Sequence, residues 1–162
     1  INKCLSENIE KIIASGIRWI WQTGKYYFEN VNALVSVTQA WNVTVMAFID
    51  RMDLAYSASD IIVSRAGAGT ISELCIAGKP AVLIPSPNVA EDHQTKNAMA
   101  LAVKDAAIVI KDSEVGTRLL PELFSLINDE SKRKRLSENI RSLAMVDSDI
   151  MIAREILKLT GI

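Results

Sequence analysis

Residues 60–73 have the sequence DIIVSRAGAGTISE, and this stretch decides the fold. It begins with a short apolar, β-branched run, which is typical of a buried strand. Gly67 and Gly69 follow, and the apolar spacing from Ile71 onward is typical of a helix. A glycine loop at this place lets the backbone approach a ligand, and the helix start offers unpaired N–H groups and a positive dipole end. We therefore predict that the loop holds the diphosphate of a nucleotide-sugar.

The same alternation of strands and helices extends through the chain. Apolar runs predict five strands, at residues 17–22, 42–48, 60–64, 81–84 and 107–110. Helical spacing predicts helices at residues 1–14, 25–37, 50–56, 70–77, 93–103, 116–127, 131–145 and 148–159. Apolar strands that alternate with helices favour an α/β fold, a Rossmann-like parallel sheet with helices on both faces.

A parallel sheet of this kind binds its ligand at the carboxyl ends of its strands. Three loops leave such ends, at residues 48–52, 64–70 and 85–94. We therefore expect these three loops to converge on one ligand.

Length, charge and cysteine content limit the class of protein. The chain has 162 residues, which favours one domain, and its net charge of −1 argues against a nucleic-acid partner. Cys4 and Cys75 lie far apart in helical patterns, so we predict that both are reduced and that the protein is intracellular. No apolar run approaches the roughly 20 residues of a membrane span, and the sequence has no signal-peptide pattern.

Glu73 has two interpretations from the residues alone. The spacing Thr70-x-x-Glu73 is typical of a capping box, in which the glutamate side chain accepts a hydrogen bond from the N-cap N–H. Alternatively, the two oxygens of the carboxylate accept hydrogen bonds from both hydroxyls of a ribose. The glycine loop before it likewise has a plain interpretation, as a tight strand-to-helix turn.

His93 and Gln94 begin a further helix after a proline-rich loop. A lone histidine is more often structural than catalytic. No group of Cys, His, Asp and Glu has metal-ligand spacing, so we predict neither a metal site nor a cofactor. A glutamine amide and a neutral imidazole each offer a donor and an acceptor, which suits sugar hydroxyls.

Taken together, these motifs resemble one known family. The residues that carry the resemblance are 58–73, Gly78-Lys79-Pro80, Ile84-Pro85, 92–98, Trp21-Gln22-Thr23-Gly24 and Phe48-Ile49-Asp50-Arg51-Met52. They closely resemble the carboxy-terminal domain of the MurG family, the UDP-N-acetylglucosamine-dependent N-acetylglucosaminyltransferases of peptidoglycan synthesis. The match extends along essentially the whole chain, and it is the combination that is specific.

The resemblance implies the GT-B architecture, in which two Rossmann-like domains face each other across a cleft. Residues 1–162 would be a single UDP-sugar (donor) binding domain, truncated at its amino-terminal end and without the acceptor-binding domain. In the family, a strand and a second glycine-rich loop directly precede the helix that starts here at Ile1. That strand would be central, so we expect a sheet split into two parts with unpaired edges, or a chain that rearranges or pairs with its own copy.

The resemblance also implies roles for individual residues. Ile49 would bind uracil through its backbone, with Met52 packing nearby. The helix start would contact the diphosphate and the sugar, Glu73 would hold the ribose hydroxyls, and Gln94 with His93 would contact the N-acetylglucosamine hydroxyls. No catalytic residue is expected in this chain. The expected donor-binding residues are Ile49, Met52, Ala68, Gly69, Thr70, Ile71, Ser72, Glu73, His93 and Gln94.

The whole protein that the resemblance implies is an inverting glycosyltransferase. It would move N-acetylglucosamine from UDP-N-acetylglucosamine to the C4 hydroxyl of a lipid-linked muramyl-pentapeptide, at the inner face of the bacterial cytoplasmic membrane. The absent domain would bind the lipid acceptor and the membrane, so this chain alone is expected to be inactive. Two alternatives stay open: a non-catalytic nucleotide-sugar-binding subunit with a membrane partner, and a glycosyltransferase for another lipid-linked acceptor or a natural product.

Overall fold

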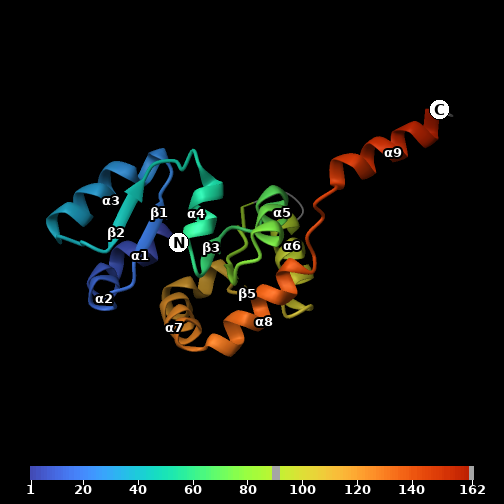
Figure 1. The fold of residues 1–162 in the computed structure, drawn as a ribbon. Coiled ribbons are helices and arrows are strands. Elements are labelled where there is room, and N and C mark those ends of the chain that lie inside the picture. The colour runs from blue at the N-terminus through green and yellow to red at the C-terminus, as the bar shows by residue number, and fades with distance from the viewer. Residues whose placement is uncertain (89–91, 161–162) are drawn as a thin grey trace.

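The computed structural model describes residues 1–88 and 92–160. All five predicted strands are present, each shorter than the apolar run that predicted it. They are β1 (Trp19–Gln22), β2 (Val43–Met46), β3 (Ile62–Ser64), β4 (Ala81–Leu83) and β5 (Ile108–Val109). Figure 1 shows them alternating with helices, as expected of an α/β fold.

The helices follow the predicted order but differ at some ends. They are α1 (Asn2–Glu7), α2 (Ile9–Ala14), α3 (Lys25–Val37), α4 (Met52–Ala58), α5 (Ala68–Ala77), α6 (His93–Ala102), α7 (Val115–Asn128), α8 (Glu130–Arg141) and α9 (Ser148–Thr160), with a short 3-10 helix η2 (Asp112–Glu114). The prediction of a single helix over residues 1–14 is wrong, because the helix is interrupted at Asn8. There the side-chain Nδ2 donates to the Cys4 carbonyl at 2.9 Å, while the backbone N–H donates to Leu5.

The strands form two separate parallel sheets. β1 pairs with β2, and β3, β4 and β5 form the second sheet in that order. Among the described residues no strand lies between β1 and β3, so each of these strands has one unpaired edge. The predicted split of the sheet is confirmed, and Figure 1 shows the two-stranded sheet apart from β3.

β4 lies at the centre of the core because both of its faces are buried. Val82, and Ile84 just beyond the strand, belong to a hydrophobic cluster with residues of α1, α2 and α7. Ala81 and Leu83 belong to a second cluster, with residues of α5, α6 and α8. Alternate residues of a strand point to opposite faces, so helices cover both faces of the three-stranded sheet, as predicted.

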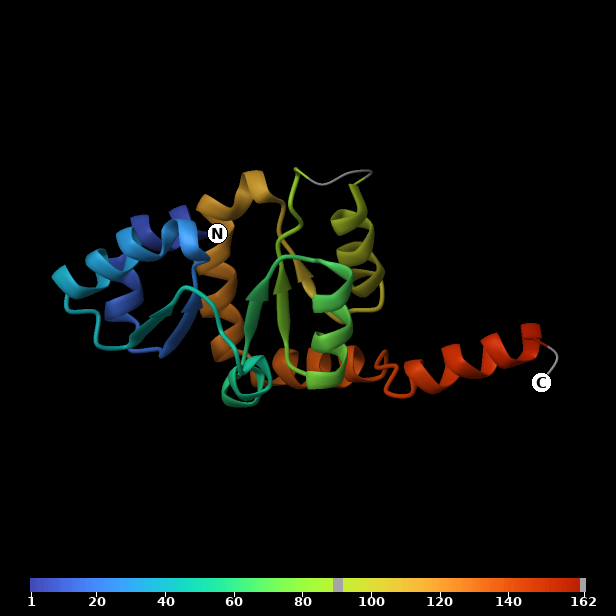
Figure 2. The same cartoon turned by 90° about the horizontal axis from the view of Figure 1, so that it is seen from above.

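The first of these clusters also joins the two sheets. It contains Trp21 of β1 and Val43 of β2 together with residues of β4 and α7. Figure 2 shows α7 alongside both sheets. Helix packing therefore holds the two sheets in one body, although no described strand connects them.

α9 projects away from this body in both views, and its apolar side chains are exposed. It has 13 residues. Across residues 1–88 and 92–160, no helix has the length and apolar character that crossing a bilayer requires.

The end of α5 depends on Gly78. Its φ of +61° is a left-handed conformation, which costs an L residue roughly 1–2 kcal/mol. A Cβ at this position would lie 3.2 Å from Cδ of Arg141, so α8 leaves little room for a side chain. We expect Gly78→Ala to lower the free energy of unfolding by about 1–2 kcal/mol. Urea denaturation followed by circular dichroism measures the change.

Gly116→Ala is the matched control for this prediction. Gly116 lies in α7, and no atom lies within 4 Å of the place its Cβ would occupy. Alanine is favoured over glycine inside a helix, so this variant should keep its stability or gain up to about 1 kcal/mol. Equal losses in the two variants would contradict the role assigned to Gly78.

Candidate functional site

Side chains hold together the loops at the carboxyl ends of β3, β4 and β5. Arg65 directly follows β3, and its Nη1 donates to the carbonyls of Ile84 and Pro85 at 3.2 Å each. The same nitrogen donates to Oδ1 of Asp112, beyond β5, at 2.6 Å. The Arg65 guanidinium thus joins three loops of the protein.

Gln94, in the first turn of α6, fastens the same edge. Its Oε1 accepts hydrogen bonds from the N–H groups of Ala66, at 3.3 Å, and Ser86, at 2.9 Å. Because a backbone N–H can only donate, these bonds decide which amide atom is the oxygen. Gln94 therefore joins the 64–70 and 85–94 loops, two of the three loops expected to converge, and Nε2 is the donor atom of its amide.

The glycine loop leaves the start of α5 open. Gly67 precedes the helix with φ −65° and ψ 149°, and no side chain caps it. The first intrahelical donor is Ile71, whose N–H reaches the Gly67 carbonyl at 2.9 Å, so the N–H groups of residues 68–70 have no partner within the helix. A Cβ on Gly69 would meet no atom within 4 Å. The loop is therefore an open helix start rather than a turn that needs glycine dihedral angles.

The capping-box interpretation of Glu73 is wrong. The N-cap of α5 is Gly67, and Thr70 lies within the helix. The Glu73 side chain turns instead toward α4, where its Oε2 accepts a hydrogen bond from the Tyr56 hydroxyl at 2.9 Å. The carboxylate is exposed, and its Oε1 has no hydrogen-bond partner among the described residues.

Tyr56 is a residue of this site that sequence reasoning missed. Burial raises the pKa of its phenol, and the hydrogen bond to Glu73 raises it further. The hydroxyl, which is protonated at neutral pH like that of any tyrosine, acts as the donor in this bond. Only one feature of the sequence indicated this residue. Met52 and Tyr56 are four residues apart, so they share one face of the predicted helix.

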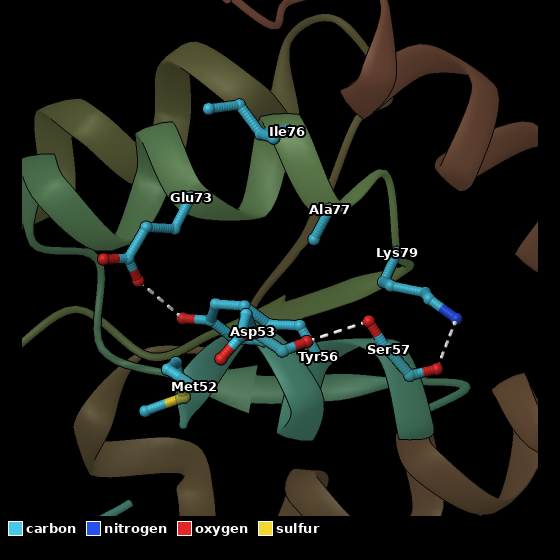
Figure 3. A pocket seen from close by; sticks show the side chains of 8 residues that line it. All are labelled: Met52, Asp53, Tyr56, Ser57, Glu73, Ile76, Ala77 and Lys79. Atoms are coloured by element: carbon cyan, nitrogen blue, oxygen red, sulfur yellow. Dashed lines mark hydrogen bonds between the residues drawn. The ribbon is translucent and has the colours of Figure 1, made fainter. Parts of the chain in front are cut away.

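An open pocket of about 420 Å³ lies between α4 and α5. Figure 3 shows Glu73 above and Tyr56 below, joined by their hydrogen bond, with Met52 beside them. The pocket is lined by Met52, Asp53, Tyr56, Ser57, Glu73, Ile76, Ala77 and Lys79. The structure thus brings together two of the predicted residues, Met52 and Glu73.

Ile49 does not line this pocket. It contributes to a second groove, with Ile20 and Leu54 among its lining residues. Its backbone N–H donates to Oε1 of Gln22, the last residue of β1, at 2.9 Å. In this structure the Ile49 N–H is therefore engaged, and Gln22 is a second residue that sequence reasoning missed.

His93 begins α6 and is exposed beside Gln94. Ile71 is half-buried against the second core cluster, and Ser72 is exposed and donates its hydroxyl to the Ala68 carbonyl at 3.2 Å. Within the part of the chain that the structure describes, no three His, Cys, Asp or Glu side chains gather as metal ligands do.

The sequence of this chain matches a model of a known protein family. Residues 1–154 match the family described as "Glycosyltransferase family 28 C-terminal domain". The chain belongs to this family.

Curated relatives are similar to this family 28 chain along nearly all of its length. One from Bacteroides thetaiotaomicron is 54% identical over 88% of this chain and 39% of the relative. One from Phocaeicola vulgatus is 50% identical over 98% of this chain and 43% of the relative. Both are named UDP-N-acetylglucosamine--N-acetylmuramyl-(pentapeptide) pyrophosphoryl-undecaprenol N-acetylglucosamine transferase. This chain therefore spans less than half the length of these relatives.

Two solved structures share the fold of this family 28 chain. MurG from Acinetobacter baumannii superposes with a TM-score of 0.80 at 31% identity, over 96% of this chain and 46% of that one. The glycotransferase of kitacinnamycin superposes with a TM-score of 0.57 at 20% identity, which shows a likeness of fold alone.

The two bonds to Gln94 give a prediction about stability. Gln94→Ala would leave the N–H of the buried Ala66 and that of Ser86 without an acceptor. We expect a loss of about 1–3 kcal/mol in the free energy of unfolding, measured by urea denaturation. Lys96→Ala, an exposed change in the same helix, is the control and should alter stability by less than about 0.5 kcal/mol. Equal stability of the two variants would contradict the role of Gln94 in holding the Ala66 and Ser86 loops together.

Proposed function

We propose that this chain is the UDP-N-acetylglucosamine-binding domain of an inverting N-acetylglucosaminyltransferase of peptidoglycan synthesis. The substrate is inferred from the names of curated relatives that are 46%, 54% and 50% identical. Those alignments cover 43%, 39% and 43% of the relatives. We infer that residues 1–162 supply the donor site and that a separate domain supplies the acceptor site.

The observation that carries the proposal is the arrangement of α5. Its open N-terminus offers the N–H groups of Ala68, Gly69 and Thr70 to a diphosphate. Glu73 lies three residues further along, a rise of about 4.5 Å, and its carboxylate is not consumed by a cap. A ribose joined directly to the diphosphate would therefore meet Glu73 while the phosphates meet the helix start.

Neighbouring elements would hold the two ends of the donor. Met52 lines the pocket of Glu73, so the base would pack against it beside the ribose. The Ile49 N–H is engaged by Gln22, which leaves the Ile49 carbonyl for the N3–H of uracil. At the other end, Nε2 of Gln94 would donate to an N-acetylglucosamine hydroxyl, with His93 beside it.

In the reaction, the C4 hydroxyl of a lipid-linked muramyl-pentapeptide would attack the anomeric carbon of the donor. A new C–O bond forms with inversion, the bond to the diphosphate breaks, and UDP leaves. The N–H groups and dipole at the start of α5 would stabilise the charge that develops on the leaving diphosphate. The catalytic base would come from the separate domain, so this chain alone would bind the donor weakly and would not turn it over.

We place the reaction at the inner face of the bacterial cytoplasmic membrane. The separate domain would contact both the lipid acceptor and the membrane surface. The unpaired edges of β1 and β3 support a further strand between them, supplied by the rest of the protein or by a second copy of the chain.

Glu73→Ala tests the ribose contact in the natural protein that contains this chain. A carboxylate that accepts from two hydroxyls should contribute about 2–3 kcal/mol, so UDP affinity should fall by roughly 30- to 150-fold in a calorimetric titration. Stability should change by less than about 1 kcal/mol, since the exposed side chain is not a cap. Glu10→Ala, an exposed change in α2, is the control. Unchanged UDP affinity in the Glu73 variant would refute the contact.

Donor titration tests the sugar. We expect UDP-N-acetylglucosamine to bind more tightly than UDP-glucose or UDP-galactose, because the relatives from which the donor is inferred are named as N-acetylglucosamine transferases. Calorimetry on the natural protein measures all three affinities. A preference for UDP-glucose or UDP-galactose would point to a different transferase.

A further inference from the structure

The hydrogen bond between Tyr56 and Glu73 joins the two helices that line the pocket. The Tyr56 hydroxyl donates to Oε2 of Glu73 at 2.9 Å, across the groove between α4 and α5. Figure 3 shows the two side chains pointing toward each other from opposite walls. They are 17 residues apart in the sequence.

We propose that Tyr56 is a positioning residue that holds the Glu73 carboxylate in the orientation in which it accepts the two ribose hydroxyls. The inference rests on the proposed function, because it assigns to Tyr56 a part in the same donor site. Tyr56 itself need not touch the ligand, since it acts through the carboxylate.

The exposure of Glu73 makes such a partner necessary. A glutamate side chain on a helix surface has several rotamers, and fixing one of them on ligand binding costs conformational entropy. Among the described residues no cation pairs with Glu73, and Lys79, on the same pocket wall, donates to the Ser57 carbonyl at 3.4 Å. The Tyr56 hydroxyl is therefore the group that orders the carboxylate before the ligand arrives.

The geometry leaves enough acceptor capacity for a vicinal diol. A carboxylate has about four lone-pair positions, and Tyr56 occupies one of them on Oε2. Both positions on Oε1 and one on Oε2 remain for the 2′ and 3′ hydroxyls.

Tyr56 lies on the same short helix as Met52, the residue that we place against the base. α4 begins at Met52, which the proposed function places against the base, and Tyr56 lies one turn later on the same helix face. α4 has seven residues and none of them is buried, so few contacts hold it. The ring of Tyr56, packed on the second core cluster, therefore holds α4 and Met52 in place, and its hydroxyl is left to position the Glu73 carboxylate.

The alternative is that Tyr56 serves only to pack α4 on the body. Its ring is half-buried against the second core cluster, which a phenylalanine would preserve. Tyr56→Phe removes the hydroxyl and keeps the ring, so it separates the hydrogen bond from the packing. A second ligand without the ribose hydroxyls then separates positioning of the carboxylate from any general effect on the pocket.

The test is calorimetric titration of UDP and of 2′,3′-dideoxy-UDP into the natural protein that contains this chain. The variants are Tyr56→Phe, Glu73→Ala and the double change, with thermal unfolding as the check on folding. Tyr26→Phe is the matched control, since Tyr26 is 86% exposed on α3. We expect Tyr56→Phe to weaken UDP roughly five- to ten-fold and the dideoxy analogue less than two-fold. The double variant should bind UDP no more weakly than Glu73→Ala.

Two results would overturn the inference and leave the proposed function standing. One is UDP affinity in Tyr56→Phe equal to that of the wild type, while Glu73→Ala abolishes the preference for UDP over the dideoxy analogue. The other is an equal loss for both ligands in Tyr56→Phe, which would show a packing role. By contrast, a wild-type protein that binds the two ligands equally would overturn the ribose contact of Glu73, and this inference with it.

Discussion

Beyond the last ladder bond of β3 and β4, the backbone must find other hydrogen-bond partners, and the site depends on how it does so. Arg65 donates to two carbonyls that follow β4 and to a carboxylate that follows β5. Gln94 accepts from the N–H groups of Ala66 and Ser86. Because these bonds come from side chains, the loops are held at the carboxyl edge while the start of α5 stays uncovered. A preformed edge of this kind reduces the ordering that a ligand must induce.

α5 then gathers the recognition groups on one rigid element. Its first turn carries the unpaired N–H groups, and Glu73 follows within the second turn. The absence of a side-chain cap at Gly67 has two consequences: it keeps the N–H groups open, and it leaves the glutamate to be ordered from α4 by Tyr56. The other end of the helix is closed by the left-handed Gly78, whose carbonyl accepts a hydrogen bond from the Ser137 hydroxyl of α8. The end of the helix to which we assign the diphosphate is thus the end whose backbone hydrogen-bonding groups have fewer partners.

The strands could be predicted because short runs of apolar, β-branched residues are typical of buried strands. All five predicted strands are present. Their ends could not, since strand length depends on pairing, and β5 keeps only two residues where it pairs with β4. The helix over residues 1–14 was predicted unbroken because its apolar period continues through Asn8. The period carries no information on the Asn8 side chain, which bonds the Cys4 carbonyl and interrupts the helix. The split of the sheet was predicted from the strand order that the family resemblance implies, and the structure has the two separate sheets.

The sequence by itself determined the α/β class, the order of the elements and the loop from which a helix start opens, because these depend on local periodicity and on glycine. It also placed Met52 and Glu73 in one site, through the resemblance to a family. Only the tertiary structure decided that Glu73 bonds Tyr56 rather than its own helix cap, and that Oε1 of Gln94 bonds the backbone of two loops. The physical reason is that these bonds join separate elements, up to 28 residues apart, whose approach is set by packing of the core.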